Sequence, residues 1–362
     1  MKLDEVQLTH FRNISAAKLH PSRQLTVISG VNGSGKSSLL ESIYYLGFGR
    51  SFRTKKHQSV IHHDMEAFSI FAKCVDDAGD AFKVGIERTR GEQFTCSING
   101  THSSRLADLV SRIPVQLFTP QSTDLILGSP SERRRFCDWG LFHVEHSFNG
   151  LSQQYGKLLR HRNALLKQQA NLRRPEYQYW ESQFDVVGNA LHDLRQRYVD
   201  NLTPIFESFL KNFLPEFEVS VSYYKGWEKD ATLSESLVKK SEYDAKMGHT
   251  SSGPHKADIR FKLNGVSAQE ILSRGQLRMA VAALQLAQTA LFNQLTSRKS
   301  IFLLDDVGAE LDIDKRERFI DGLLDMDTQV FVTAIEREQL SFINKYNEKR
   351  MFHVEHGHVT EE

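Results

Sequence analysis

An eight-residue loop near the N-terminus constrains the fold of this chain more than any other feature. Residues Gly30–Ser37 read GVNGSGKS and match the pattern G-x-x-x-x-G-K-[ST]. A β-branched run, Leu25–Ser29, precedes the loop, and an apolar segment suited to a helix, Ser38–Leu46, follows it. A strand, a glycine-rich loop and a helix in this order form a cradle whose backbone N–H groups face phosphate oxygens. The sequence therefore predicts an α/β fold that binds ATP.

Two side chains of this loop carry specific expectations. Lys36 would reach the β- and γ-phosphates, and Ser37 would bind Mg²⁺. The residues that we expect to contact ATP through the loop are Gly30, Val31, Asn32, Gly33, Ser34, Gly35, Lys36 and Ser37. A chance glycine-rich turn is the alternative, and the strand and helix that flank the loop argue against it.

A pair of acids follows a second apolar run. Ile301–Leu304 reads as a buried parallel strand, and Asp305 and Asp306 come directly after it. An acid in this place binds the metal ion of a phosphate loop. We therefore expect Asp305 to be a Mg²⁺ ligand and Asp306 to polarise the attacking water, which makes Asp306 and Lys36 the predicted catalytic residues. A strand-end acidic turn without a catalytic role is the alternative.

The segment LSRGQL, Leu272–Leu277, resembles the ABC-type ATPase signature L-S-G-G-Q, with Arg274 in place of the first glycine. A serine hydroxyl and a glycine N–H at a helix start can form a second anion site. The resemblance implies that Ser273, Gly275 and Gln276 close on the γ-phosphate held by another subunit. ATP would then drive formation of a homodimer. The alternative is that Ser273 only caps the helix.

Other positions also resemble ABC motifs. Gln121 stands where the Q-loop residue would be, although a plain turn is an open alternative, and Thr333 stands at the switch position. Glu310–Asp312 resembles the D-loop. Most ABC ATPases have a glutamate where Asp306 stands, so the shorter side chain implies slow hydrolysis.

The spacing of these motifs indicates a large insertion. Ser37 and Ser273 are much further apart than the corresponding residues of transporter ATPases. Heptad-like apolar stripes over Leu151–Leu172 and Phe184–Phe209 predict a short antiparallel helical hairpin, with two separate amphipathic helices as the alternative. The expected organisation is an ABC-type head made of residues 1–118 and 255–362, with a mainly helical lobe, 119–254, inserted.

Motifs along the whole chain resemble the RecF family of SMC- and Rad50-like ATPases. The opening Leu8–Asn13, LTHFRN, is similar to that of SMC-like heads, which implies that Arg12 reaches the nucleotide; an exposed strand-end arginine is the alternative. The segments that resemble RecF are Gly47–Arg53, Gly128–Phe136, Gly253–Asp258 and Asp305–Asp312. Two positions depart from the family pattern: Ala309 replaces a serine in the D-loop, and Gln121 stands where a glutamate is common.

The resemblance implies ATP-driven dimerisation on DNA and a preference for single-stranded and gapped duplex DNA. It also implies loading of a recombinase with partners of the RecO and RecR type, a role at replication forks, and a part in the SOS response. A second interpretation is the motor subunit of a membrane transporter, and a third is a structural, cohesin-like clamp.

Composition limits how the chain could meet DNA. The net charge is only +1, so local basic clusters would have to make the contacts. The clusters we consider, each with a solvated face as the alternative, are Arg50, Arg53, Lys55, Lys56 and His57, and in the helical region Arg133–Arg135, Arg160, Arg162, Arg173 and Arg174. Three scattered cysteines, no leader pattern and no apolar run of about 20 residues favour a cytoplasmic protein.

Overall fold

The computed structural model describes the chain except residues 92, 104, 170–171, 173 and 336–342, and except the side chains of Glu176, Ala309 and Glu310. It divides into two compact units. Unit 1 comprises residues 1–122 and 274–362, and unit 2 comprises residues 123–273. The expected lobe ended at residue 254, but unit 2 extends to Ser273 because the strands after residue 257 pair within it.

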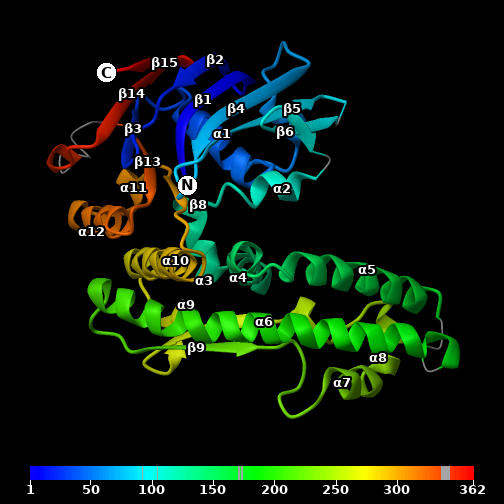
Figure 1. Cartoon of the computed structure of the whole chain (residues 1–362). Helices are drawn as coiled ribbons and strands as arrows, with labels where there is room; N and C mark the ends of the chain where they lie inside the picture. The colour runs from blue at the N-terminus through cyan, green and yellow to red at the C-terminus, as the bar shows by residue number, and fades with distance from the viewer. Residues whose placement is uncertain (92, 104, 170–171, 173, 336–342) are drawn as a thin grey trace. The chain divides into compact units, whose positions relative to one another are not determined.

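Unit 1 contains two sheets (Figure 1). The central sheet has the order β15-β14-β3-β13-β12-β8, in which all neighbours are parallel except β15. Its strands are β3 (Leu25–Ser29), β8 (Val115–Phe118), β12 (Ile301–Leu304), β13 (Gln329–Ala334), β14 (Lys349–Glu355) and β15 (His358–Glu361). The buried strands expected before the phosphate loop and before the acid pair are confirmed as β3 and β12, and every residue of both is buried.

The second sheet of unit 1 is antiparallel and has the order β2-β1-β4-β5-β6-β7. Its strands are β1 (Lys2–Phe11), β2 (Ile14–Leu19), β4 (Ala67–Val75), β5 (Ala81–Thr89), β6 (Phe94–Ile98) and β7 (Thr101–Ser103). The helical elements of unit 1 are α1 (Lys36–Phe48), η1 (His57–Val60), α2 (Leu106–Val110), η2 (Pro120–Thr123), α10 (Arg274–Thr296), α11 (Val307–Glu310) and α12 (Ile313–Leu324).

Helix α1 shares one apolar core with both sheets. Its residues Leu39, Leu40 and Ile43 pack in a cluster that includes Leu8 of β1 and Leu303 of β12. This burial on two sides anchors the phosphate loop, because α1 begins at Lys36, inside the loop.

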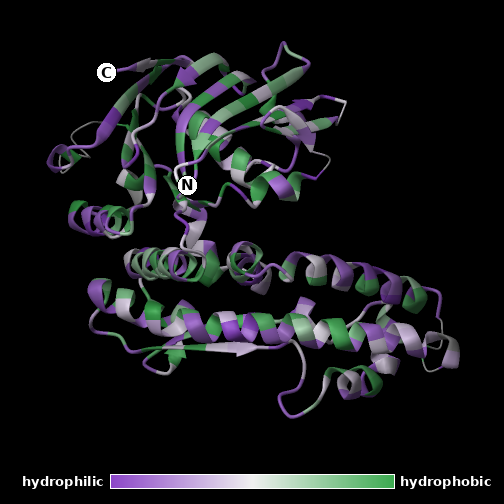
Figure 2. Ribbon diagram, viewed as in Figure 1, coloured by the Kyte–Doolittle hydropathy of each residue, from purple (hydrophilic) through white to green (hydrophobic). Residues whose placement is uncertain are grey.

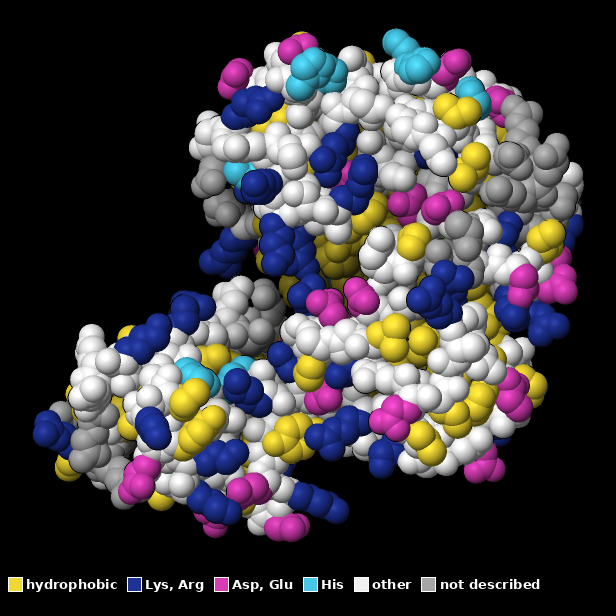
Figure 3. Space-filling model, turned by 180° about the vertical axis from the view of Figure 1, so that it is seen from behind, with side chains coloured by type: hydrophobic (Ala, Val, Ile, Leu, Met, Phe, Trp, Pro, Cys, Tyr) yellow, Lys and Arg dark blue, Asp and Glu magenta, His cyan; other side chains and the backbone are white. Residues whose placement is uncertain are grey.

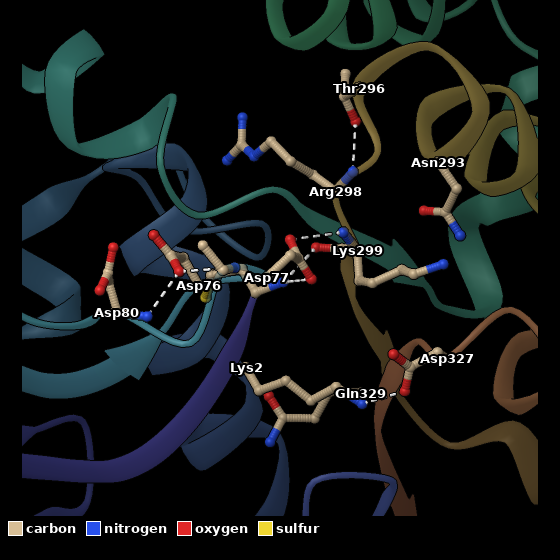
Figure 4. A network of polar contacts seen from close by, with 12 residues as sticks. Lys2, Asp76, Asp77, Asp80, Asn293, Thr296, Arg298, Lys299, Asp327 and Gln329 are labelled. Carbon is tan, nitrogen blue, oxygen red and sulfur yellow. Dashed lines mark hydrogen bonds and ion pairs between the residues drawn. The ribbon is translucent and has the colours of Figure 1, made fainter.

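Polar contacts also tie the two sheets together (Figure 4). The buried side chain of Gln329 accepts from the backbone of Leu3 at 2.7 Å and donates to Leu3 at 2.9 Å and to Ser22 at 2.7 Å. Asp77 accepts from the backbone N–H of Lys299. The hydrogen bonds of Gln329 are buried and would be costly to leave unmade, so they help to hold the two sheets in one register.

Unit 2 is built around a long helical hairpin. Its elements are α3 (Asp124–Leu127), α4 (Pro130–Val144), α5 (Phe148–Lys167), α6 (Pro175–Phe213), β9 (Val219–Tyr224), α7 (Leu233–Lys239), α8 (Ser241–Met247), η3 (Pro254–Lys256), β10 (Asp258–Leu263), β11 (Val266–Ser267) and α9 (Ala268–Ile271). The predicted hairpin is confirmed: α5 and α6 run antiparallel and pack together (Figure 1). Hydrophobic and hydrophilic residues alternate along both helices (Figure 2). Helix α6 also packs on the three-stranded sheet β11-β10-β9.

Candidate nucleotide site

The phosphate loop wraps tightly because three of its glycines adopt backbone conformations that other residues rarely take. Gly30, Gly33 and Gly35 have φ angles of 149°, 81° and 123°. A Cβ atom on Gly30 would lie 2.3 Å from the carbonyl oxygen of Val354, so no larger residue fits there. The loop closes beside β14 and leads directly into the N-terminus of α1.

The side chain of Lys36 is held by backbone carbonyl groups of this loop. Its Nζ donates to the carbonyl oxygens of Gly30 at 2.7 Å and Val31 at 3.0 Å, and its side chain is mostly buried. Burial lowers the pKa of Lys36, and the nearby charges of Asp306 and Asp305 oppose that shift. Neutral carbonyls are weaker partners for an ammonium than phosphate oxygens, so the arrangement suits an exchange of partners when a nucleotide binds.

The two predicted metal ligands meet. Ser37 Oγ donates to Asp305 Oδ1 at 3.0 Å, although 268 residues separate them. Burial raises the pKa of Asp305, while hydrogen bonds from Thr333 and Ser37 act in the opposite direction. A hydroxyl and a carboxylate at this distance are hard oxygen donors of the kind Mg²⁺ prefers, so these residues fit the ion.

Thr333 lies between the two acids. Its hydroxyl donates to Asp305 Oδ1 at 2.9 Å and accepts from the backbone N–H of Asp306 at 2.8 Å. Asp306 has a φ of 51°, which is uncommon for a residue other than glycine. Contact of Thr333 with the γ-phosphate stays a prediction, because in this structure the hydroxyl is bonded to the acid pair.

A buried carboxylate, Glu41, positions two arginines beside the phosphate loop. Glu41 of α1 is fully buried and accepts from Arg12 at 3.0 and 2.7 Å. It also accepts from Ser51 and lies 3.7 Å from the guanidinium of Arg53. Arg12 further donates to the carbonyl of Ser59 at 2.6 Å. Glu41 thus holds two arginines at the edge of the phosphate loop.

These residues surround one pocket of about 600 Å³ in unit 1. The predicted site residues that line it are Arg12, Asn32, Gly33, Gly35, Lys36, Ser37, Asp305, Asp306 and Thr333. Sequence reasoning did not assign Asn13, Ser38, Arg53, Ser59, Ile61, His62, His63 and Ile335 to it. The sequence groups Arg53 with a basic cluster for DNA, yet it lines this pocket, where burial raises the pKa of Asp305 and the charge of Arg53 partly opposes that rise. No local pattern marks Arg53, because only the folded chain brings it near residue 305.

The remaining predicted contacts are not among the described residues that line this pocket. Gln121 is exposed in the turn η2, where its backbone N–H donates to Thr119. Ser273 and Gly275 are exposed at the start of α10, and Gln276 is partly exposed. A Cβ atom on Gly275 would meet nothing within 4 Å. These positions are exposed or partly exposed, and their contact with ATP stays a prediction.

The D-loop segment has a structural anchor. Asp312 caps α12 by accepting from the backbone N–H of Lys315 at 3.0 Å. Arg316 donates to the carbonyl oxygens of Gly308 at 3.0 Å and Leu311 at 2.7 Å. The side chain of Ala309, the residue that departs from the family pattern, lies outside the described part of the structure.

Among the residues that the structure describes, no helix has both the length and the apolar character needed to cross a lipid bilayer.

Known proteins resemble this chain over its whole length. Residues 2–360 match the family model described as the RecF/RecN/SMC N terminal domain. A DNA replication and repair protein RecF from Pseudoalteromonas atlantica is 53% identical over 363 residues, covering 100% of both chains. A protein of the same name from Shewanella piezotolerans is 39% identical over 99% of both chains.

Solved structures agree with the fold. The structure of a recombination mediator protein RecF with ATP, from the RecFOR pathway, matches with a TM-score of 0.89 at 24% identity, covering 100% of this chain and 97% of that one. An Smc head bound to the C-winged helix domain of ScpA matches with a TM-score of 0.60 at 12% identity, over 100% and 97% of the chains. The architecture is therefore that of an ABC-type ATPase head with an inserted helical unit.

Proposed function

Because the chain belongs to the RecF family of DNA replication and repair proteins, within the RecF/RecN/SMC N-terminal domain family, we propose that ATP binding makes it dimerise and bind DNA. The observation that carries this proposal is the meeting of Lys36, Ser37, Asp305 and Thr333 at the mouth of one pocket. Residues from three distant segments converge there with the chemistry that a Mg²⁺-bound triphosphate needs.

In the proposed mechanism the loop N–H groups and the N-terminus of α1 hold the phosphates, and Lys36 moves from its carbonyl partners to the β- and γ-phosphates. Ser37 and Asp305 would hold Mg²⁺, which neutralises the charge that develops on the phosphates. Asp306 would orient the attacking water. Its short side chain and its fixed backbone favour slow turnover, so nucleotide binding rather than rapid hydrolysis would set the state of the protein.

Ser273, Gly275 and Gln276 would complete the site of a second copy of the chain. Their exposure at the start of a 23-residue helix supports this role, since an N–H-rich helix start attracts the γ-phosphate of a partner subunit. Gln121 would sense the nucleotide from the turn after β8. Each site of the homodimer would then combine Lys36 of one chain with Ser273 of the other.

The proposed partners are DNA, in single-stranded and gapped duplex form, and mediator proteins of the RecO and RecR type. We also propose that the protein acts in the cytoplasm, that it maintains replication forks and helps to load a recombinase, and that the SOS response requires it. Identity of 53% over the whole chain to a RecF protein favours this role over that of a transporter motor subunit.

Mixing two variants tests the shared site. Ser273→Arg should leave ATP binding by the dilute monomer intact and prevent ATP-dependent dimerisation in sedimentation experiments. Lys36→Ala should weaken ATP binding and prevent dimerisation. A mixture of the two variants should recover dimers with one working site, because one chain supplies Lys36 and the other supplies Ser273. A large loss of monomer ATP affinity in Ser273→Arg would contradict the shared site.

Asp306→Asn tests the catalytic assignment separately. The variant should bind ATP and dimerise but hydrolyse far more slowly, so that dimers on DNA persist. Turnover at the rate of the unmodified protein would remove Asp306 from the mechanism.

A further inference from the structure

Two groups of basic residues in unit 2 have different surroundings, which the sequence alone does not reveal. In the first group the guanidinium is buried and paired: Arg133 with Asp258 at 2.7 Å, and Arg195 with Asp138 at 2.8 Å. Arg162 binds Glu181 at 3.0 Å and Asp244 at 2.9 Å. These arginines hold the unit together and cannot contact a ligand, although Arg133 and Arg162 belong to the clusters considered for DNA.

The second group lies on the outer side of α5. Lys157, Arg160 and Lys167 are exposed, and their spacing of three and seven residues places them on one face of the helix. None of the three forms an ion pair with another described residue. The 20-residue helix contains no aspartate or glutamate. Figure 3 shows lysine and arginine side chains scattered over the surface of the helical unit.

Exposed aromatic rings border this basic face. His161 of α5 contacts Trp180 of α6 edge to face, with ring centroids 4.9 Å apart. Tyr179 meets Trp180 at 5.5 Å, and the two side chains are 65% and 44% exposed. An exposed tryptophan ring offers a flat apolar surface on which an unpaired base can stack.

We propose that this surface, the α5 face (Lys157, Arg160, His161, Lys167 and Trp180), binds single-stranded DNA. The three basic side chains extend over about 15 Å of helix, so each can contact a different phosphate of one strand. Trp180 stacks on an unpaired base beside them. Phosphate contacts and stacking are independent of base identity, so the surface fits DNA of any sequence. This inference rests on the proposed DNA binding and names the surface that carries it out.

The test combines charge removal with a salt titration. The triple variant Lys157→Gln, Arg160→Gln, Lys167→Gln is titrated with a fluorescent 30-residue oligothymidylate in the presence of ATP. Loss of three phosphate contacts should reduce the slope of log affinity against log salt by about 2. The matched control Lys229→Gln, Lys246→Gln, Lys262→Gln removes the same charge from exposed lysines elsewhere in unit 2 and should keep the slope.

Substitution of Trp180 distinguishes binding of single-stranded DNA from binding of duplex DNA. Trp180→Ala should weaken binding of the oligothymidylate by about tenfold and leave binding of a blunt duplex unchanged, while Trp180→Phe should retain most of the affinity. Equal losses for both DNA forms would overturn the single-strand assignment. A triple variant with an unchanged slope, or a control with the same reduction, would overturn the surface. If the unmodified protein dimerises with ATP but binds no DNA, the proposed function itself fails.

Discussion

The nucleotide site of unit 1 and the helical unit 2 satisfy their buried cations in opposite ways. Lys36 is paired with two loop carbonyls, which a ligand can replace. Arg162 is paired with two carboxylates inside unit 2 and has no route to a ligand. A buried cation is thus exchangeable at Lys36 and permanently paired at Arg162. Its partners, rather than its charge, decide whether it serves binding or stability.

Breaking a permanent pair should have the largest effect on folding. Arg162→Met leaves the fully buried Asp244 and the partly buried Glu181 without their cation, and should lower the free energy of unfolding by about 3–5 kcal/mol. Urea unfolding measures this, with Lys157→Met on the exposed side of the same helix as the control. Equal unfolding curves for the two variants would show that the buried pair does not stabilise unit 2.

Removing the exchangeable cation should instead damage binding. Lys36→Ala should weaken ATP binding by about 1.5–3 kcal/mol, since a charge-assisted hydrogen bond to phosphate is lost. The free energy of unfolding should change by less than about 1 kcal/mol, because only two neutral carbonyls lose a partner. Calorimetric titration and urea unfolding of one preparation give both values. A loss of stability as large as that of Arg162→Met would remove the contrast between the units.

The buried histidine His255 of unit 2 should make the stability of the protein depend on pH. His255 Nε2 donates to the carbonyl of Thr250 at 2.9 Å, so Nδ1 accepts from the hydroxyl of Tyr155 at 2.7 Å. Burial lowers the pKa of His255 from 6.5 to about 4.

Because the unfolded chain binds a proton at His255 more readily than the folded one, this contribution to stability is complete above pH 6.5. It is lost as the pH falls toward 4, by about 2 kcal/mol between pH 7 and pH 5. Urea unfolding of the unmodified protein and of His255→Gln at both pH values isolates the effect. The same pH dependence in the variant would exclude His255 as its source.

The smallest expected effect lies within the nucleotide site. Thr333→Val removes the hydroxyl that bonds Asp305 and Asp306. This variant should raise the Mg²⁺ concentration needed for ATP binding about fivefold. Thr333→Ser keeps the hydroxyl and should leave that concentration unchanged. Binding of a fluorescent ATP analogue in EDTA should be unchanged by Thr333→Val. An equal loss in EDTA would instead indicate that Thr333 contacts the γ-phosphate.

The sequence alone was enough to predict the phosphate loop, the two strands β3 and β12, and the helical hairpin, because each depends on residues that are close together in the chain. The phosphate loop needs glycines at fixed positions, and the strands β3 and β12 need unbroken apolar runs, so both were readable from short segments. The apolar periodicity of residues 151–209 was enough to predict the helical hairpin, because a helix buries one face.

Only the tertiary structure decided which charged residues can contact a ligand and which are buried in ion pairs. Arg53 lies at the nucleotide pocket because it meets Glu41 in the folded chain. Arg133 and Arg162 are buried because each pairs with an acid far away in the sequence. These acids are Asp258 and Asp244. Thr333 meets the acid pair because β13 lies beside β12 in parallel register. No local pattern records such pairings: the free energy of an ionised group depends on what surrounds it in space, and those surroundings exist only after folding.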